Sequence, residues 1–332
     1  MRKVSFENQG LSKRGWTIIK IVLAAILLFF VLKKIDPSAL RSSLSLSPVW
    51  LLANFGAFLA MLLLKGLQYK VLLGEQEPYP AVLKVIAWQS AISNFVATSA
   101  GIASYMAMLK AERNVKLRRS GVVFLLVKFG DLLAIAFYLM LAAAWVWGDI
   151  APLRWLTVLL ALGTLGGAFA FLVVVLGRQH FVRLVTKILS WMKLTRSPWA
   201  FQGLAALHAL AQESQTLIVR MLGKSIGLSF LYMTVTMIFA YTGMQIFHVQ
   251  VNPWAIFYVA SVMQLVSFIP IQVLGGLGVS EITAVYLYGV FGLDQGKISA
   301  VMLGLRAIFY SMNAIILLSL LLETSLRRRL SR

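Results

Sequence analysis

The chain has 332 residues, of which 60% are hydrophobic and only 13% are charged, whereas soluble domains carry about 25% charged residues. Apolar runs long enough to cross about 30 Å of hydrocarbon recur along the chain, and they are continuous rather than alternating. These features argue against a separate soluble catalytic domain and predict an all-α, polytopic integral membrane protein.

The net charge of +20 comes mainly from Lys and Arg residues in the connections between the apolar runs. Basic residues at such places orient a membrane protein and attract anionic lipid head groups. We expect no nucleic-acid partner, because no basic helix or aromatic RNA-binding strand accompanies the charge. The chain contains no cysteine, which excludes disulfides, thiol chemistry and Cys-ligated metals.

The apolar segments follow one another at 16–32, 48–64, 84–109, 120–147, 155–177, 224–247, 254–271, 279–292 and 298–322. No small-residue cleavage site follows the first segment, so we predict a retained span rather than a signal peptide. The polar stretch 178–223 contains interleaved apolar residues and predicts an amphipathic helix on the membrane surface. A solvated helical connection between two halves is equally consistent with it.

Short loops rich in Lys and Arg remain in the cytoplasm. The N-terminal tail, the loop 110–119, the stretch 178–223 and the tail after residue 322 are basic, so we place them inside. The linker 248–253 has no Lys, Arg, Asp or Glu and is placed outside. We therefore expect a multi-pass protein of the bacterial cytoplasmic (inner) membrane with both termini in the cytoplasm.

The third apolar segment conflicts with a simple alternation of spans. Lys65, Lys70 and Lys84 fit an inside loop before it, and 84–109 would then end outside, directly before the most basic loop. Its middle, Ser93 to Gly101, is polar and rich in small residues. We predict a broken, re-entrant hairpin that enters and leaves on the cytoplasmic side, where protein or water covers its backbone. The alternative is an ordinary span and a single failure of the charge rule.

The second half repeats this pattern with the opposite orientation. Residues 254–292 would form a hairpin that enters and leaves from outside and is broken at Pro270 to Gly278, and 298–322 would end inside. The predicted fold therefore has about six full spans plus two oppositely oriented hairpins, arranged as an inverted repeat of 1–150 and 151–332. Transporters of this layout bind their substrate where the broken helices meet near the midplane.

Ionisable side chains within apolar segments are costly and mark functional sites by default. Asp131 and Arg306 lie at parallel places after the two hairpins, which predicts that they flank one cavity. Alternatively, Asp131 pairs with Lys128 or Arg306 as a structural partner, and Lys128 extends toward the membrane interface. Glu281 fits a cavity role or a helix N-terminus favoured by the dipole. Arg306 fits a lipid phosphate or a buried acid.

Three glycines, Gly275, Gly276 and Gly278, permit positive φ and close approach, and a following helix N-terminus would aim N–H groups at a phosphate. Asn94 and Gln264 offer further hydrogen bonds, or satisfy the backbone of a broken helix. Three scattered histidines predict no metal site, and no fingerprint predicts a cofactor. The predicted substrate-binding residues are Asp131, Glu281, Arg306, Gly275, Gly276, Gly278, Asn94 and Lys128.

The run Pro270 to Glu281 contains the pattern Gly-Gly-x-Gly-x-x-Glu and is followed by Arg306 about one helix later. Together with the stretch Asn94 to Gly101 and with Asp131 in the next span, it resembles the lysylphosphatidylglycerol synthase transmembrane-region family over most of the chain. The resemblance implies a flippase-like membrane protein. It does not imply lipid aminoacylation, because the soluble aminoacyl-transferase domain of true synthases is absent.

The first-half motif departs from the family pattern. The family usually has Pro and then Arg-x-Gly-Glu, whereas here Ser99 or Ala100 stands where Arg is expected and Ile102 where Glu is expected. An Arg usually precedes the Asp of the next span, and here Lys128 is the nearest base. The first-half site is therefore altered relative to the family.

These features predict a membrane protein that moves, or helps to move, a lipid or a lipid-linked envelope precursor between leaflets. Arg306 would hold phosphate, and Asp131 and Glu281 would hold a cationic or hydroxylated part or exchange protons. We expect a membrane lipid or lipid-linked substrate and anionic head groups at the basic loops as partners, and a homo-oligomer is allowed. The alternatives are an integral-membrane transferase that acts on a lipid carrier and a scaffold for envelope-assembly enzymes.

Overall fold

The structure is a computed structural model that describes residues 46–191, 215–268 and 278–330. Every regular element in these ranges is helical, which confirms the predicted all-α fold. The elements in chain order are α3 (Pro48–Leu73), α4 (Tyr79–Phe95), α5 (Thr98–Arg113), α6 (Leu117–Trp145), the short 3-10 helix η1 (Ala151–Leu153), α7 (Arg154–Trp191), α9 (Gln215–Ile246), α10 (Pro253–Ser267), α11 (Val279–Val290) and α12 (Gln295–Leu330).

Five of these helices are long and apolar enough to cross a membrane, namely α3, α6, α7, α9 and α12. They coincide with five of the six predicted full spans, and the sixth, 16–32, lies outside the described residues. Large apolar side chains on α7, such as Trp155, Leu162 and Phe169, are exposed. A large apolar surface of this kind marks contact with a partner or a membrane, as expected for a lipid-facing helix.

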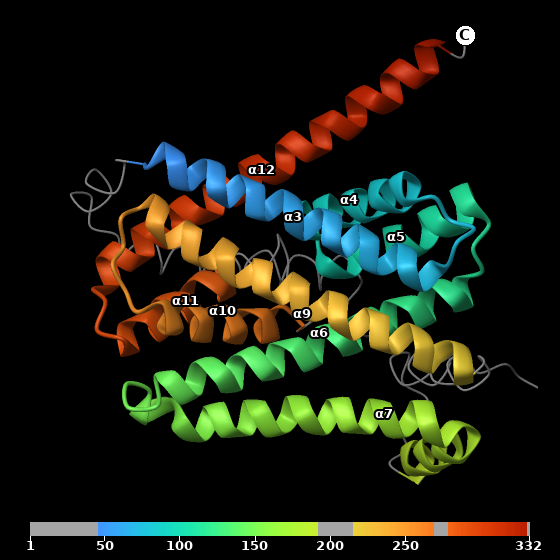
Figure 1. Ribbon diagram of the computed structural model, residues 1–332, viewed down its shortest axis with the longest axis horizontal. Helices are drawn as coiled ribbons and strands as arrows, with labels where there is room; N and C mark the ends of the chain where they lie inside the picture. The colour runs from blue at the N-terminus through green and yellow to red at the C-terminus, as the bar shows by residue number, and fades with distance from the viewer. Residues whose placement is uncertain (1–45, 192–214, 269–277, 331–332) are drawn as a thin grey trace, which may run out of the picture.

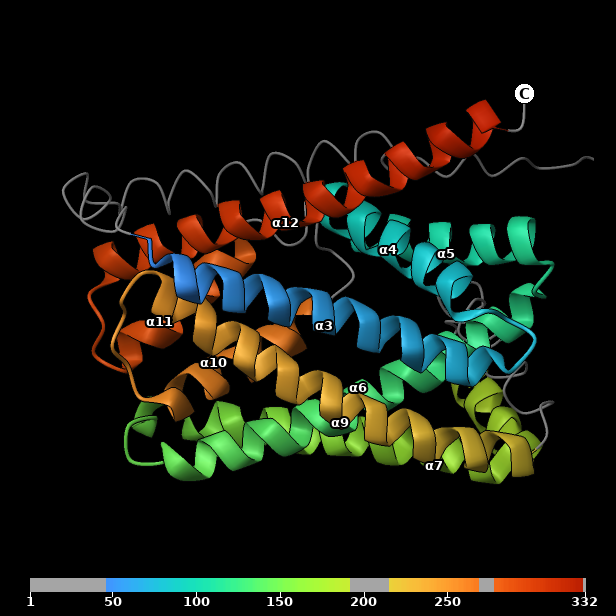
Figure 2. The same ribbon diagram turned by 45° about the horizontal axis from the view of Figure 1, so that its top comes forward.

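The long helices α3 and α9 are antiparallel and form the centre of the bundle (Figures 1 and 2). At one end the Ser47 N–H donates to the Ile246 carbonyl at 3.1 Å. At the other end the Gln68 amide donates to the Ser229 hydroxyl at 2.6 Å. Helix α6 packs on α9, and α7 packs on α6 at the edge of the bundle (Figure 1).

The predicted first hairpin is a pair of packed helices, α4 and α5, separated by a break at Val96 and Ala97. They have 17 and 16 residues, so the longer one spans only about 25 Å at 1.5 Å per residue. Glycine at position 101 permits the close contact, because a Cβ there would overlap Ser93 and lie 2.8 Å from the Gln89 carbonyl oxygen. The alternative of one ordinary span over 84–109 is therefore wrong.

This hairpin begins and ends at the same end of the molecule. Glu77, just before α4, accepts a hydrogen bond at 2.6 Å from Arg113, the last residue of α5. Arg119, near the start of α6, donates to the Leu73 carbonyl at the end of α3, also at 2.6 Å. We call this the basic end, defined by residues 74–78 and 110–119. The placement of that end in the cytoplasm stays a prediction.

The second hairpin opens at the opposite end, which we define by residues 146–152, 247–252 and 291–294. Trp254 at the start of α10 stacks on Trp145 at the end of α6, with ring centroids 5.2 Å apart. Tyr258 on α10 meets Phe291, which follows α11, at 5.9 Å. The two hairpins are therefore oppositely oriented, as predicted. The predicted break at Pro270 to Gly278 lies outside the described residues except for Gly278.

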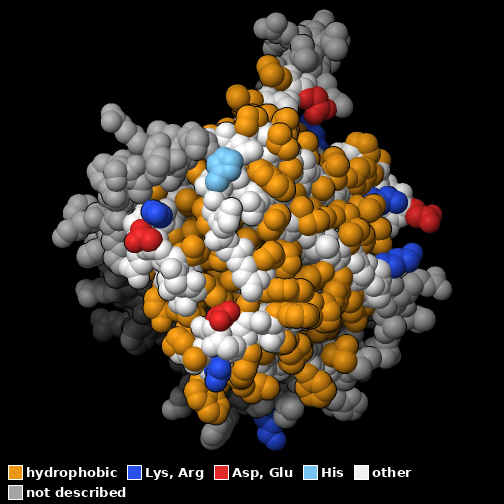
Figure 3. Space-filling view, turned by 60° about the vertical axis from the view of Figure 1, so that its left-hand side comes forward, with side chains coloured by type: hydrophobic (Ala, Val, Ile, Leu, Met, Phe, Trp, Pro, Cys, Tyr) orange, Lys and Arg blue, Asp and Glu red, His pale blue; other side chains and the backbone are white. Residues whose placement is uncertain are grey.

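Each hairpin also packs against a long helix of the other half of the chain. Helix α4 packs on α12, and α10 packs on α6. An inverted repeat requires such matched pairs of contacts, although the division into repeats 1–150 and 151–332 stays a prediction. The view of the opposite end in Figure 3 shows apolar side chains over most of the described part of the visible face, with few charged groups among them.

The predicted element boundaries need three corrections. Lys65 and Lys70 lie within α3, and Lys84 lies within α4, so none of them belongs to a loop. Residues 178–191 continue α7 as the same helix, and α9 begins at Gln215 rather than at 224. Residues 192–214, the middle of the predicted amphipathic stretch, lie outside the described part of the chain.

Two hydrophobic cores lie at the two ends of the bundle. The first joins α3, α4, α5 and α6 near the basic end and includes Tyr69, Leu72, Val85, Tyr105 and Leu126. The second joins α6 and α9 to α10, α11 and α12 near the opposite end and includes Leu139, Met244, Tyr258, Val259 and Leu287. Each hairpin is anchored in one core. A third, smaller cluster on α6 and α9 contains Ala134, Ile135, Met233 and Met237.

Candidate functional site

An ion pair joins the second hairpin to the last long helix. The Nε atom of Arg306 on α12 lies 3.1 Å from Oε1 of Glu281, and the side chains are 14% and 4% exposed. The guanidinium also lies over the Tyr310 ring, 5.1 Å from its centroid. Of the alternatives for Arg306, the structure therefore shows contact with a buried acid. A phosphate at Arg306 would have to compete with this carboxylate.

Glu281 is held by the start of α11 as well as by Arg306. It is the third residue of that helix, and its Oε2 accepts a hydrogen bond of 2.5 Å from the N–H of Gly278. A carboxylate is favoured at this place by the helix dipole. Gly278 has φ of +86°, which favours glycine. The other two predicted glycines, Gly275 and Gly276, lie outside the described residues.

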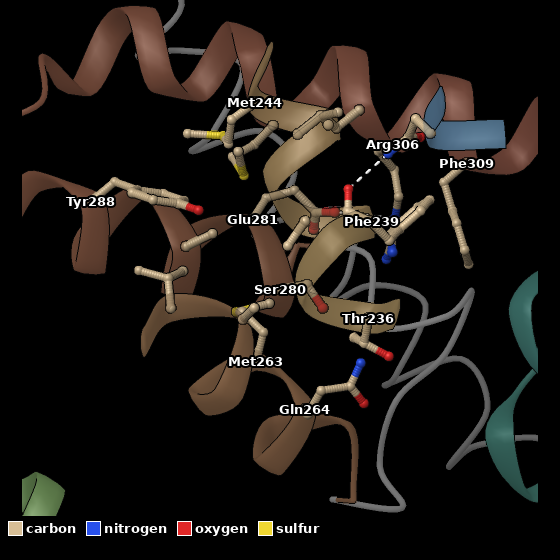
Figure 4. Close-up of a pocket in the computed structure, with 18 residues that line it drawn as sticks. Thr236, Phe239, Met244, Met263, Gln264, Ser280, Glu281, Tyr288, Arg306 and Phe309 are labelled. Atoms are coloured by element: carbon tan, nitrogen blue, oxygen red, sulfur yellow. Dashed lines mark hydrogen bonds and ion pairs between the residues drawn. The ribbon is translucent and has the colours of Figure 1, made fainter. Parts of the chain in front are cut away.

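The Glu281–Arg306 pair borders a cavity of about 290 Å³ between α3, α9, α10, α11 and α12. Figure 4 shows the two charged side chains facing each other, with Gln264 and Thr236 close together on another part of the wall. Most of the wall is apolar. The described lining residues are Asn54, Thr236, Phe239, Ala240, Gly243, Met244, Val259, Ala260, Met263, Gln264, Ser280, Glu281, Ala284, Tyr288, Met302, Leu305, Arg306 and Phe309.

A second buried ion pair joins α3 to α6. Both carboxylate oxygens of Asp131, midway along α6, lie 2.7 Å from the Lys65 ammonium. The Ser229 hydroxyl on α9 donates to the same carboxylate at 2.9 Å. The Lys65 ammonium also contacts the Gln68 amide oxygen at 3.0 Å and lies 4.1 Å from the centroid of the Tyr232 ring. Asp131 thus pairs with neither of the two bases that the sequence suggested.

Small residues allow the three helices to approach at this pair. A Cβ at Gly130 would lie 2.7 Å from the Ser229 hydroxyl oxygen and 3.3 Å from the Ser225 carbonyl oxygen. The glycine next to Asp131 therefore brings α9 within hydrogen-bond reach of the carboxylate. Gln68 donates to Ser225 and Ser229 and holds α3 against the same stretch of α9.

The Lys65–Asp131 pair borders a smaller cavity of about 60 Å³, which Lys128 also lines. The Lys128 ammonium lies over the Phe268 ring, 4.5 Å from its centroid, so it points into the space between α6 and the end of α10. Gln264 lines both this cavity and the larger one. Asp131 and Arg306 therefore flank two adjoining cavities rather than the single cavity that was predicted.

The structure places Asn94 away from both ion pairs. Its amide donates to the Asn313 oxygen at 2.9 Å and joins the tip of α4 to α12. Lys65, in contrast, was missed as a site residue because it was assigned to a loop. The apolar pattern continues beyond it to Leu73, and Gln68 follows one helical turn later, so an extended helix with a polar stripe was the available signal.

Comparison with known proteins gives one family. No curated protein and no solved structure matches the chain. The model of the family described as "Lysylphosphatidylglycerol synthase TM region" matches residues 17–316, a range that includes the two hairpins and the four residues of the two ion pairs. The chain is therefore a membrane protein that belongs to the lysylphosphatidylglycerol synthase transmembrane-region family.

Proposed function

We propose that this protein moves a lipid or a lipid-linked envelope precursor between the leaflets of the bacterial cytoplasmic membrane, rather than modifying it chemically. The observation that carries the proposal is the pair of adjoining cavities, each bordered by a buried ion pair inside a bundle of apolar helices. A charged group inside the hydrocarbon region is costly and is retained there mainly for function. Family membership supports the same proposal.

The geometry suggests how a head group would be accommodated. Both cavities lie between the second hairpin and the long helices, and none of their described lining residues belongs to the first hairpin. Gln264 borders both cavities. A head group in them would find charged and amide groups in place of water, while its acyl chains stay in the lipid. The wide, mostly apolar wall of the larger cavity fits a substrate that carries both a polar and an apolar part.

Reconstituted vesicles test this proposal. The wild-type chain would be placed in phosphatidylcholine vesicles with a trace of a lipid that carries a nitrobenzoxadiazole label, and dithionite would then bleach the label in the outer leaflet. We expect the inner-leaflet label to be bleached as well when the protein moves the lipid, and this movement to be lost in Asp131→Asn and in Glu281→Gln. Lys297→Gln, a substitution of an exposed lysine, should move lipid like the wild type.

The same vesicles separate the rival functions. Mass spectrometry of the recovered lipid would detect a new lipid species if the protein were a transferase. A scaffold would leave the inner-leaflet label protected for each labelled lipid, and it would leave every lipid unchanged. The proposal is contradicted if the inner-leaflet label stays protected from dithionite in wild-type vesicles with each of three labelled lipids: phosphatidylglycerol, phosphatidylethanolamine and a glycolipid.

A further inference from the structure

The ionisable groups of the two cavities do not balance. Among the described residues that line them, the acids are Asp131 and Glu281, and the bases are Lys65, Lys128 and Arg306. Lys65 is paired with Asp131, and Arg306 is paired with Glu281. No carboxylate in the described ranges lies within ion-pair distance of the Lys128 ammonium. The cavities therefore carry one excess positive charge, at Lys128.

The surroundings of Lys128 offer it only partial compensation. Its ammonium lies over the Phe268 ring at 4.5 Å and is 5.9 Å from the centroid of the Phe124 ring. The face of an aromatic ring attracts a cation, but less than a full negative charge does, and a charge removed from water needs such a partner. An anion in the cavity would supply it.

The small cavity suits an oxyanion. Its volume of about 60 Å³ equals the space for about four to six water molecules at 10–15 Å³ each, which is enough for the four oxygens of a phosphate group. The Gln264 amide and the Tyr232 hydroxyl line it together with Lys128 and Lys65, so neutral donors are available beside the charge. Gln264 also lines the larger cavity, which would hold the rest of a head group.

We propose that Lys128 anchors a phosphoryl oxyanion in the small cavity, and that the protein selects ligands whose phosphate-bearing head group has a net negative charge. This site adds a ligand preference to the proposed lipid movement. It depends on that proposed function only where it identifies the ligand as a transported lipid. It replaces Arg306 by Lys128 as the group that holds phosphate, because Arg306 is already in contact with Glu281.

Ligand-induced stabilisation of the purified full chain tests the anchor without any transport. Unfolding in detergent would be followed by tryptophan fluorescence with either inorganic phosphate or dioctanoyl-phosphatidylglycerol, each against chloride at matched ionic strength. Binding to the folded state raises Tm. We expect the rise in the wild type and in Lys297→Gln, a smaller rise in Lys128→Arg, and the smallest rise in Lys128→Gln at the same ligand concentration. Loss of a charge-assisted contact weakens binding by about tenfold or more.

The two ligands distinguish the source of the phosphate. A rise with the lipid but not with inorganic phosphate assigns the cavity to a lipid head group, and a rise with both assigns it to the phosphoryl group itself. An equal rise in wild type and Lys128→Gln, or no rise with either ligand in the wild type, overturns the anchor. Lys128→Gln should remain folded without ligand, because it removes an uncompensated charge, and its Tm should not fall below that of the wild type.

Vesicles then separate the anchor from the proposed function. Labelled phosphatidylglycerol carries the phosphate, and labelled glucosylceramide lacks it. We expect Lys128→Gln to slow the movement of the first by about tenfold or more relative to Lys297→Gln. Suppose that the wild type moves no lipid, but Lys128→Gln weakens ligand binding in the unfolding experiment. The anchor then stands, and the transport proposal fails. If wild type moves phosphatidylglycerol and Lys128→Gln does so equally fast, transport stands and the anchor fails.

Discussion

At the scale of single residues, the fold depends on pairing charges that the hydrocarbon region cannot solvate. The Asp131 carboxylate receives both a bidentate contact from Lys65 and a hydrogen bond from Ser229. Three helices contribute these groups, so the pair also fixes how α3, α6 and α9 cross. Removing one partner leaves the other as an uncompensated buried charge, which is the costly case.

We therefore expect Asp131→Asn to reduce the free energy of unfolding by about 3–5 kcal/mol, the usual cost of breaking a buried pair. The double variant Lys65→Met, Asp131→Asn should recover part of this loss, because it also removes the stranded ammonium. Thermal unfolding in detergent measures both. The pairing is contradicted if the loss in the double variant equals the sum of the losses in Asp131→Asn and in Lys65→Met, because residues in contact show a coupling energy.

At Gly278 the backbone conformation, rather than a charge, determines how α11 begins. Its φ of +86° places the start of α11 so that its N–H donates to Glu281. Gly278→Ala should cost about 1–2 kcal/mol, because an L side chain is strained at positive φ. Gly227→Ala on α9, where a Cβ meets nothing within 4 Å, is the matched control, and it should be neutral or stabilising. Equal Tm values for the two variants would rule out this account.

At the scale of elements, the first hairpin is a pair of short helices whose polar break is covered by long helices. Helix α4 contacts α3, α5 and α12, and Asn94 pairs with Asn313 near the break. The close contact of α5 on α4 depends on the missing side chain at Gly101, because a Cβ there would overlap Ser93. The first hairpin is therefore the element most sensitive to one added methyl group.

Gly101→Ala should displace α5 from α4 and lower Tm, whereas Gly121→Ala on α6 should not, since a Cβ at Gly121 meets no atom within 4 Å. Alanine in a helix interior is favoured over glycine by about 1 kcal/mol, so the control separates helix propensity from the clash. Hydrogen exchange gives the local readout, and protection should fall in 98–105 but not in α9. Unchanged protection in 98–105 would refute the clash.

At the scale of the whole molecule, the two hairpins open at opposite ends of the bundle. The contact of Arg113 with Glu77 closes the first hairpin at the basic end, and the stacking of Trp145 on Trp254 places the second at the other. The basic end, residues 74–78 and 110–119, carries several Lys and Arg residues, so from the positive-inside rule we predict that it lies in the cytoplasm.

The absence of cysteine from the chain makes this orientation directly testable. Single substitutions Glu75→Cys and Glu112→Cys flank the first hairpin, and His248→Cys lies at the opposite end, all three at exposed positions. In intact cells an impermeant maleimide should label only position 248. Labelling of only one of positions 75 and 112 would show that the hairpin crosses the membrane. Labelling of both together with 248 would contradict the placement of the two ends on opposite sides.

Much of this architecture is predictable from the chain before any packing is known. Run length and hydropathy locate the five long helices, since both are properties of contiguous residues. The small polar residues of Ser93 to Gly101 locate the first break for the same reason. The end of α3 was placed too early because Lys65 interrupts the apolar run, although its charge is neutralised from a helix 66 residues away.

The sequence by itself determined a helical membrane protein with two broken hairpins and named three of the four paired residues as candidates. Only the tertiary structure decided which base neutralises which acid, namely Lys65 with Asp131 and Arg306 with Glu281, and left Lys128 as the excess cation. The physical reason is that helix formation in lipid depends on local hydrophobicity, whereas an ion pair depends on where helices distant in the chain cross. Coulomb attraction acts between neighbours in space, and spacing along one chain does not reveal them.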